Sequence, residues 1–318
     1  MKEEPDRWKS LQVSRSLFLI FVIACCLLAA FDAAHDMASH PPYRLTECLR
    51  GVSIMPYQIR ILSPLAIVGL MKWHWGIVNP RGIVRSAHVY VGLCLFFALW
   101  FLFRYLSLFF DEMTACFGVL FAALAIKWHT LLQMGDAAGL LFVVALCICV
   151  VKRHYILFLY VFALGTLNRE TTAMILPAAA ILWWSSPKRA RGEIVVALAA
   201  VFWLASRLAL KHYFNLHGNG YDMLSFNLQP SQLFKASMAF GGMWIFAILG
   251  FRKIGKDLQI LMATTVGFFI VTEIQFAKIF ELRIYTELLP VLLPAMLAAL
   301  GAAPKLRRGD PVPLQTNI

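Results

Sequence analysis

Charged residues are scarce in this chain. Asp, Glu, Lys and Arg make up 14% of its 318 residues, against about 25% in a typical soluble domain. Hydrophobic residues make up 60%, and the mean hydropathy is +0.72. Because the apolar excess runs along nearly the whole length, it excludes a globular domain with one anchor. The sequence predicts an all-α, polytopic transmembrane helical bundle with about 9–11 membrane segments of about 20 residues each.

Several familiar motifs are also missing. The sequence has no P-loop, GxGxxG, HExxH, GxSxG or DxD pattern, so ATP-driven and hydrolase functions lose support. Its seven cysteines form no CxxC pair and no Cys/His zinc spacing. The net charge of +12 comes without a basic, aromatic-rich soluble face. We therefore read the positive charge as loop residues that orient the chain in a membrane, and not as a nucleic-acid surface.

Basic residues gather in six short clusters between the apolar runs. These clusters are the N-terminal tail (Lys2, Arg7, Lys9, Arg15), the 72–85 loop (Lys72, Arg81, Arg85), Lys152 with Arg153, Lys188 with Arg189 and Arg191, Arg252 with Lys253 and Lys256, and the C-terminal tail (Lys305, Arg307, Arg308). The positive-inside rule places all six in the cytoplasm, and both termini with them.

This orientation constrains the interval between Arg85 and Lys152, which must then hold an even number of crossings. Three apolar runs lie in that interval. We therefore expect the run near 114–131 to be re-entrant or interfacial, since partial crossings are tolerated when protein buries them. The alternative is that the Lys152 cluster faces outward. The predicted division is a cytoplasmic tail (1–15) that leads into an uncleaved first span, one integral membrane domain (16–303) and a second cytoplasmic tail (304–318).

With the basic loops inside, the acidic and remaining polar residues sort to the extracytoplasmic face. Asn168, Arg169 and Glu170 form a polar stretch between two apolar runs. Charged residues at such positions are costly to bury and usually face a partner or a water-filled cavity. The sequence therefore predicts that this stretch belongs to a functional site.

Carboxylates and arginines on one membrane face suit group transfer from a lipid phosphate. A carboxylate can act as general base on a hydroxyl, and arginine can hold a phosphate through two hydrogen bonds. The candidate catalytic residues are Asp36, Asp136 and Glu170. The candidate substrate-binding residues are Arg60, Asn168, Arg169, Glu281 and Arg283, of which Arg60, Arg169 and Arg283 would bind phosphate.

Each of these residues also has a purely structural interpretation. Asp136 precedes an apolar run and could be a helix N-cap. Arg60 could extend to the lipid headgroups, and Glu170 could pair with Arg169 or with another span. Arg283 and Glu287 have the i, i+4 spacing of an ordinary helical ion pair.

Four segments carry a resemblance to a known family. PYQIRILSPL, GDAAGLLFVVAL, GTLNRETTAMILP and FELRIYTELLPVLLP occur in this order. The arrangement, over about residues 15–302, resembles bacterial polytopic glycosyltransferases of the GT-C type, in particular small members with an Asn-Arg-Glu-Thr motif. The resemblance implies a polyprenyl-phosphate sugar donor, inversion at the anomeric carbon and an acidic general base in the first outer loop. That base would be Asp36, or else Asp32, and Asp136 would be the acid of the span-opening motif.

The sequence-based hypothesis is an inverting glycosyltransferase in the bacterial inner membrane, with its active face in the periplasm. Its partners would be the polyprenyl-phosphate sugar, a glycan or lipid-linked acceptor and membrane lipids, but no nucleic acid. No cofactor is implied, and a divalent cation is left open. Two alternatives remain: a transporter or flippase for a lipid-linked or anionic solute, and a non-catalytic subunit of an envelope-polysaccharide assembly.

Overall fold

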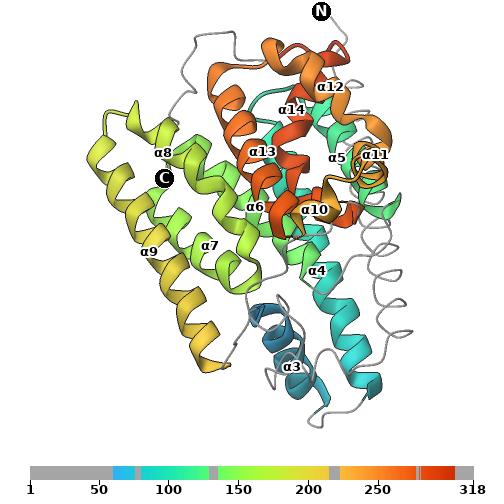
Figure 1. Cartoon of the computed structure of the whole chain (residues 1–318), viewed down its shortest axis with the longest axis vertical. Helices are drawn as coiled ribbons and strands as arrows, with labels where there is room; N and C mark the ends of the chain where they lie inside the picture. Colours follow the sequence, from blue (N-terminus) through green and yellow to red (C-terminus); the bar gives the residue numbers. More distant parts are fainter. Residues whose placement is uncertain are drawn as a thin grey trace, which may run out of the picture.

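The computed structural model describes residues 60–75, 80–128, 135–214, 223–276, 279 and 281–304, and all regular secondary structure in this part of the chain is helical (Figure 1). The all-α prediction is therefore confirmed for these residues. The longer helices are α3 (Leu62–Trp75), α4 (Pro80–Leu106), α5 (Glu112–Trp128), α6 (Asp136–Lys152), α7 (Tyr155–Asn168), α8 (Leu176–Trp184), α9 (Arg189–Tyr213), α13 (Lys256–Phe276) and α14 (Leu289–Ala299). The shorter elements are η2 (Glu170–Ile175), α10 (Leu224–Asn227), α11 (Pro230–Ser237), η3 (Ala239–Gly242), α12 (Trp244–Gly250), η4 (Phe251–Lys253) and η5 (Leu282–Leu288).

Three of the described helices are long and apolar enough to cross a membrane: Gly82–Leu106 of α4, Arg189–Tyr213 of α9 and Lys256–Gln275 of α13. Only 11% of the apolar window of α9 is buried within the protein, and Ile194, Leu198 and Val201 on this helix are exposed. An exposed apolar surface of this extent is unfavourable in water and marks a site of contact with a membrane or another protein. The helices thus indicate a membrane protein, and the number of spans stays a prediction.

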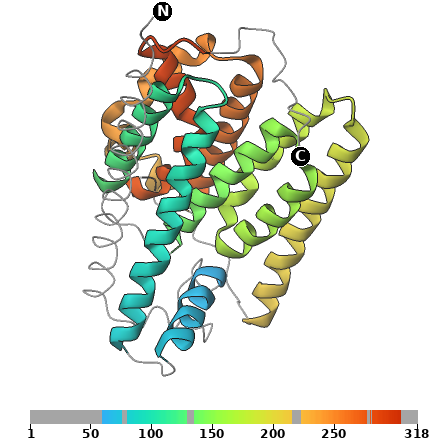
Figure 2. The ribbon, with the colours of Figure 1, turned by 180° about the vertical axis from the view of Figure 1, so that it is seen from behind.

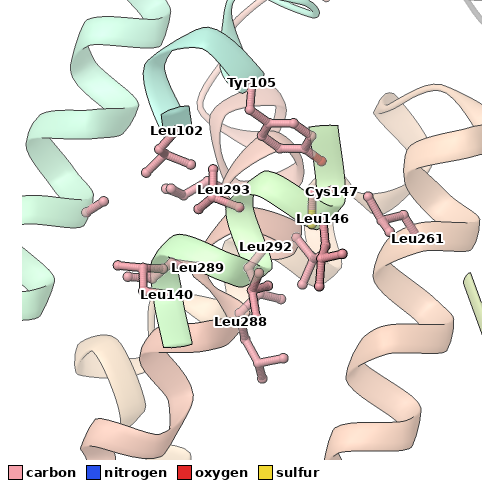
Figure 3. Close-up of a cluster of buried hydrophobic side chains, with 14 of the residues drawn as sticks. Leu102, Tyr105, Leu140, Leu146, Cys147, Leu261, Leu288, Leu289, Leu292 and Leu293 are labelled. Carbon is pink, nitrogen blue, oxygen red and sulfur yellow. The ribbon is translucent and has the colours of Figure 1, made fainter. Parts of the chain in front are cut away.

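Helices α4 and α6 run in the same direction. Near one end, the Ser63 hydroxyl lies 2.8 Å from the Tyr90 hydroxyl of α4 and donates to Asn168 Oδ1 at 2.5 Å, while Asn168 Nδ2 donates to the Gly135 carbonyl just before α6 at 2.9 Å. Toward the other end, Tyr105 of α4 lies beside Cys147 of α6 (Figure 3). The chain between the two helices, which includes α5, must therefore return along the bundle.

This parallel arrangement corrects the expected topology. Arg85, in the first part of α4, and Lys152, at the end of α6, lie at opposite ends of the bundle, whereas the sequence analysis placed both on one side. The premise for a re-entrant segment at 114–131 is therefore wrong, and α5, which overlaps that run, is a continuous helix of 17 residues. The charge rule failed here because it assigns a side to each loop without knowing the direction of the helices.

Three of the basic turns gather at one end of the bundle. The Trp183 indole donates to the Val150 carbonyl at 3.1 Å, and the Tyr155 hydroxyl lies 3.2 Å from the Ser186 hydroxyl, which brings the α6–α7 and α8–α9 turns together. The α12–α13 turn lies toward this same end in Figures 1 and 2. These contacts also bury Trp183. Its position in the sequence would equally suit a tryptophan at the lipid interface.

The other end of α6 lies about one membrane thickness away. Helix α6 has 17 residues, which at 1.5 Å per residue is roughly 25 Å, against about 30 Å for the hydrocarbon core of a bilayer. Asp136 begins this helix. Polar groups near Asp136 are therefore placed near the membrane surface opposite the three basic turns.

The start of α5 provides a first prediction. Asp111 precedes the helix and accepts hydrogen bonds from the Thr114 N–H at 3.0 Å and from the Thr114 hydroxyl at 2.6 Å. These bonds lower the pKa of the exposed Asp111 carboxyl. Asp111→Ala should destabilise the protein by about 0.5–2 kcal/mol, the usual cost of losing an N-cap. Unfolding in detergent at several pH values would measure this.

The pH dependence has a definite sign. Because the folded-state pKa of Asp111 is depressed, its stabilisation is present above about pH 4, the ordinary value for Asp, and is lost as the pH falls through the lowered pKa. The difference between wild type and Asp111→Ala should therefore shrink only in acid. An equal difference at all pH values would contradict the capping role.

Candidate functional site

Asn168, Arg169 and Glu170 lie where α7 ends and η2 begins. Arg169 between them is extended, with φ −150° and ψ 144°, and its N–H donates to the Gly165 carbonyl at 2.8 Å. In extended backbone, successive side chains point to opposite sides. The three polar side chains therefore reach different partners.

Asn168 is buried, and both the oxygen and the nitrogen of its side-chain amide form hydrogen bonds. Its Oδ1 accepts from the Ser63 hydroxyl of α3, and its Nδ2 donates to the Gly135 carbonyl that precedes α6. The Ile61 N–H also donates to the Leu167 carbonyl at 3.1 Å. Asn168, predicted to bind substrate, thus joins the ends of three helices.

Arg169 is buried between two carboxylates. Its Nη1 lies 2.9 Å from Asp136 Oδ1 and 2.7 Å from Glu287 Oε1. The second contact has ion-pair distance without the alignment of a hydrogen bond, since Glu287 Oε1 has no hydrogen-bond partner. Glu287 Oε2 accepts from the Thr171 hydroxyl at 2.6 Å. This closed group joins α6, η2 and η5, far apart in the sequence.

Two alternatives from the sequence are settled by these contacts. Asp136 is the first residue of α6, and the N-cap is Gly135, with no capping bond from a side chain. The N-cap interpretation of Asp136 is therefore wrong, and its carboxylate binds Arg169. Glu287, which the sequence suggested only as a helical partner for Arg283, belongs to the same buried group.

Glu170 forms a second, more open group with two arginines. Arg60 Nε donates to Glu170 Oε2 at 3.2 Å, and Arg60 Nη2 contacts Oε1. Arg207 Nη1 of α9 lies 3.9 Å from Glu170 Oε2, and Arg207 Nη2 donates to the Thr166 carbonyl. The Glu170 side chain is 29% exposed, whereas that of Asp136 is 1% exposed. Arg60 therefore binds a protein carboxylate instead of extending to the headgroups.

A further acid, Glu273, lies in the last turns of α13, which packs against η2. The residue is 8% exposed. No hydrogen bond or ion pair among the described residues engages its carboxylate, whose oxygens are not among the fully enclosed partnerless atoms. The charges that act on it are those of Arg60, Arg169, Glu170 and Glu287. Sequence reasoning missed Glu273 and Arg207 as site residues. The available signal was a single charged residue inside an apolar run.

The contacts given so far do not cover the remaining predicted residues. Asp36 lies outside the described residues. Glu281 precedes η5 and is half-buried, and the contacts described above do not include it. Arg283 lies in η5, and its side chain is also outside the description. Within the described residues no group of three His, Cys, Asp or Glu side chains could hold a metal ion.

The site thus consists of a closed group around Arg169, an open group around Glu170 and the acid Glu273, all at the end of the bundle opposite the three basic turns. No known protein family, curated protein or solved structure matches this chain. Its function must therefore be argued from this geometry.

Proposed function

We propose that this protein is a membrane glycosyltransferase of GT-C type, which transfers a sugar from a polyprenyl phosphate to a glycan or lipid-linked acceptor with inversion. The observation that supports the proposal is the approach of Arg60 and Arg207 to one partly exposed carboxylate, Glu170. Two guanidinium groups at one accessible position suit the charge of a departing phosphate.

The arginines have different roles in this proposal. Arg60 and Arg207 would bind the donor phosphate, with Glu170 holding both side chains in place before the donor arrives. Arginine suits this task because its planar fork matches phosphate oxygens. Arg169 is enclosed by Asp136 and Glu287, so it would position the surrounding helices and not contact the donor.

The location of the site also supports a lipid-linked donor. If the three basic turns lie in the cytoplasm, the site lies near the periplasmic surface, where a lipid phosphate resides. Arg207 lies on α9 between Leu204 and Leu208, which are both exposed. An isoprenoid chain could lie along this apolar face while its phosphate reaches Arg207. The proposed location is therefore the bacterial inner membrane with the active face outward.

Transfer assays in proteoliposomes test this proposal. Purified protein would be supplied with radiolabelled polyprenyl-phosphate sugars and an envelope glycan extract, and labelled product would be measured. We expect transfer by the wild type and a loss of about 100-fold or more in Arg60→Ala and Arg207→Ala, the scale seen when an electrostatic contact to the transition state is removed.

Arg189→Ala is the matched control, because Arg189 pairs with Glu193 on the exposed surface of α9. It should retain wild-type transfer. If the wild type transfers sugar from none of the polyprenyl phosphates tested, the proposed function fails. If transfer occurs but both site variants keep wild-type rates, the assignment of the phosphate-binding arginines fails.

One observation favours a second candidate, a transporter or flippase for an anionic lipid. The segment from α7 to α8 is interrupted by η2 at the polar site, and interrupted helices are common at the substrate sites of transporters. Exchange of labelled lipid across the proteoliposome membrane without any covalent product would favour this candidate.

A further inference from the structure

Four described carboxylates surround the site, and three of them are already bound. Asp136 and Glu287 share Arg169, and Glu170 is bound by Arg60. The Asp136 and Glu287 side chains are each 1% exposed, and an acceptor hydroxyl would have to displace Arg60 to reach Glu170. The three bound acids are thus poor candidates for taking a proton from an acceptor hydroxyl.

Glu273 differs from them in its contacts. The residue is 8% exposed. No hydrogen bond or ion pair among the described residues engages its carboxylate, and its oxygens are not among the fully enclosed side-chain atoms that lack a partner. The carboxylate oxygens of Glu273 therefore keep some accessible surface. A substrate hydroxyl can reach this position in the working enzyme without displacing an arginine.

The backbone around Glu273 is held firmly. The Asn227 side chain of α10 donates to the Ile274 carbonyl at 2.8 Å and to the Glu273 carbonyl at 3.5 Å, and the Met223 N–H donates to the Gln275 carbonyl at 2.9 Å. Helix α10 thus fixes the last turn of α13 against η2. A catalytic carboxylate needs a fixed position of this kind, since small displacements lower the rate.

We propose that Glu273 is the catalytic proton acceptor of the sugar transfer, a role that rests on the proposed function. The acceptor oxygen forms a bond to the anomeric carbon while the bond from that carbon to the phosphate oxygen breaks. The electron pair of the broken bond leaves with the polyprenyl phosphate. The proton of the acceptor hydroxyl moves to the Glu273 carboxylate.

This assignment competes with Asp36, the base implied by the family resemblance. Two substitutions separate them: Glu273→Gln and Asp36→Asn, assayed in the same proteoliposomes as the wild type. We expect Glu273→Gln to lower transfer by about 100-fold or more, within the usual range for loss of a general base. Asp36→Asn should stay within about tenfold of wild type, below that range.

A pH profile adds a readout that a structural role would not produce. Wild-type transfer should fall in acid as the base becomes protonated, and Glu273→Gln should lose this acid limb. Glu273→Asp should restore part of the rate and the limb. The charged and titratable groups that interact electrostatically with Glu273 are Arg60, Arg169, Glu170, Glu287 and Tyr285, and all remain in these variants.

The outcomes distinguish this inference from the proposed function. Absence of transfer by the wild type contradicts the function itself. If the wild type is active and folded Glu273→Gln transfers sugar at a rate within threefold of it, the role of Glu273 is overturned. A loss of about 100-fold or more in Asp36→Asn alone would overturn it as well. Glu193→Gln, an exposed acid on α9, is the control and should keep full activity.

A measurement on the wild type avoids any folding defect of the variants. A hydrophobic carbodiimide reacts with protonated carboxyl groups within membranes. We expect the carbodiimide to label Glu273, as detected by mass spectrometry, and the loss of transfer activity to be proportional to the labelled fraction. Labelling should be slower when donor and acceptor are bound. Complete labelling of Glu273 with full activity would overturn the proposal.

Discussion

Replacing Arg169 with methionine is expected to destabilise the folded protein by about 3–5 kcal/mol, the usual effect of removing one partner from a buried ion pair. The reason is that Arg169 Nη1 supplies a counter-charge to both Asp136 and Glu287. Both are fully enclosed, so water cannot replace the arginine. Methionine is an unbranched side chain that fills part of the space of the arginine side chain. The measured change therefore reflects chiefly the loss of the positive charge.

Unfolding of the purified protein in mixed detergent micelles would measure this effect. Arg189→Met is the matched control, because its partner Glu193 is exposed and exposed pairs contribute at most about 1 kcal/mol. A triple variant with Arg169→Met, Asp136→Asn and Glu287→Gln should recover part of the loss, since no unpaired charge remains. If Arg169→Met unfolds like the control, the closed group contributes little to stability.

The Asn-Arg-Glu stretch shows how far the sequence could predict this site. The high cost of charge in an apolar setting indicated that Arg169 and Glu170 face partners or a cavity, and the structure gives both of them ionic partners, which include Asp136 and Arg60. The sequence could not tell which arginine binds which acid. That pairing depends on the extended backbone of Arg169, which directs neighbouring side chains apart.

Arg207 and Glu273 show why other site residues were missed. Each is one charged residue within an apolar helix, and the sequence alone does not say which face of the helix meets the bundle. On α9 most of the surface is exposed, yet Arg207 faces the Thr166 carbonyl. Only the packing of α9 and α13 against the α7–η2 segment reveals that both residues approach Glu170 and Arg169.

The order of the helices was predicted better than their directions. The apolar run predicted near 114–131 lies close to α5 (Glu112–Trp128), because length and hydropathy are local properties. The direction of α6 relative to α4 depends instead on side-chain contacts such as Ser63 with Tyr90 and Asn168. A count of basic residues contains no information about such contacts.

The second large effect is expected at Gly250, where replacement by alanine should destabilise the protein by about 1–3 kcal/mol or more, as overpacking does. Gly250 ends α12, which packs closely on α14. A Cβ atom there would lie 2.7 Å from the Ala295 carbonyl carbon and 2.9 Å from the Ala299 nitrogen. These are backbone atoms of a buried helix, so they cannot move aside as a flexible side chain would.

Gly267→Ala is the control for this prediction, because a Cβ atom at this exposed position of α13 meets nothing within 4 Å. Alanine forms helix more readily than glycine by about 1 kcal/mol, so this variant should be neutral or more stable. Opposite shifts of the two variants in one unfolding assay would establish close contact between α12 and α14.

Since α12 leads directly into the basic turn at Arg252 and Lys253, a loosened contact should also expose that turn to protease. Equal stability of both variants would contradict the close contact between α12 and α14.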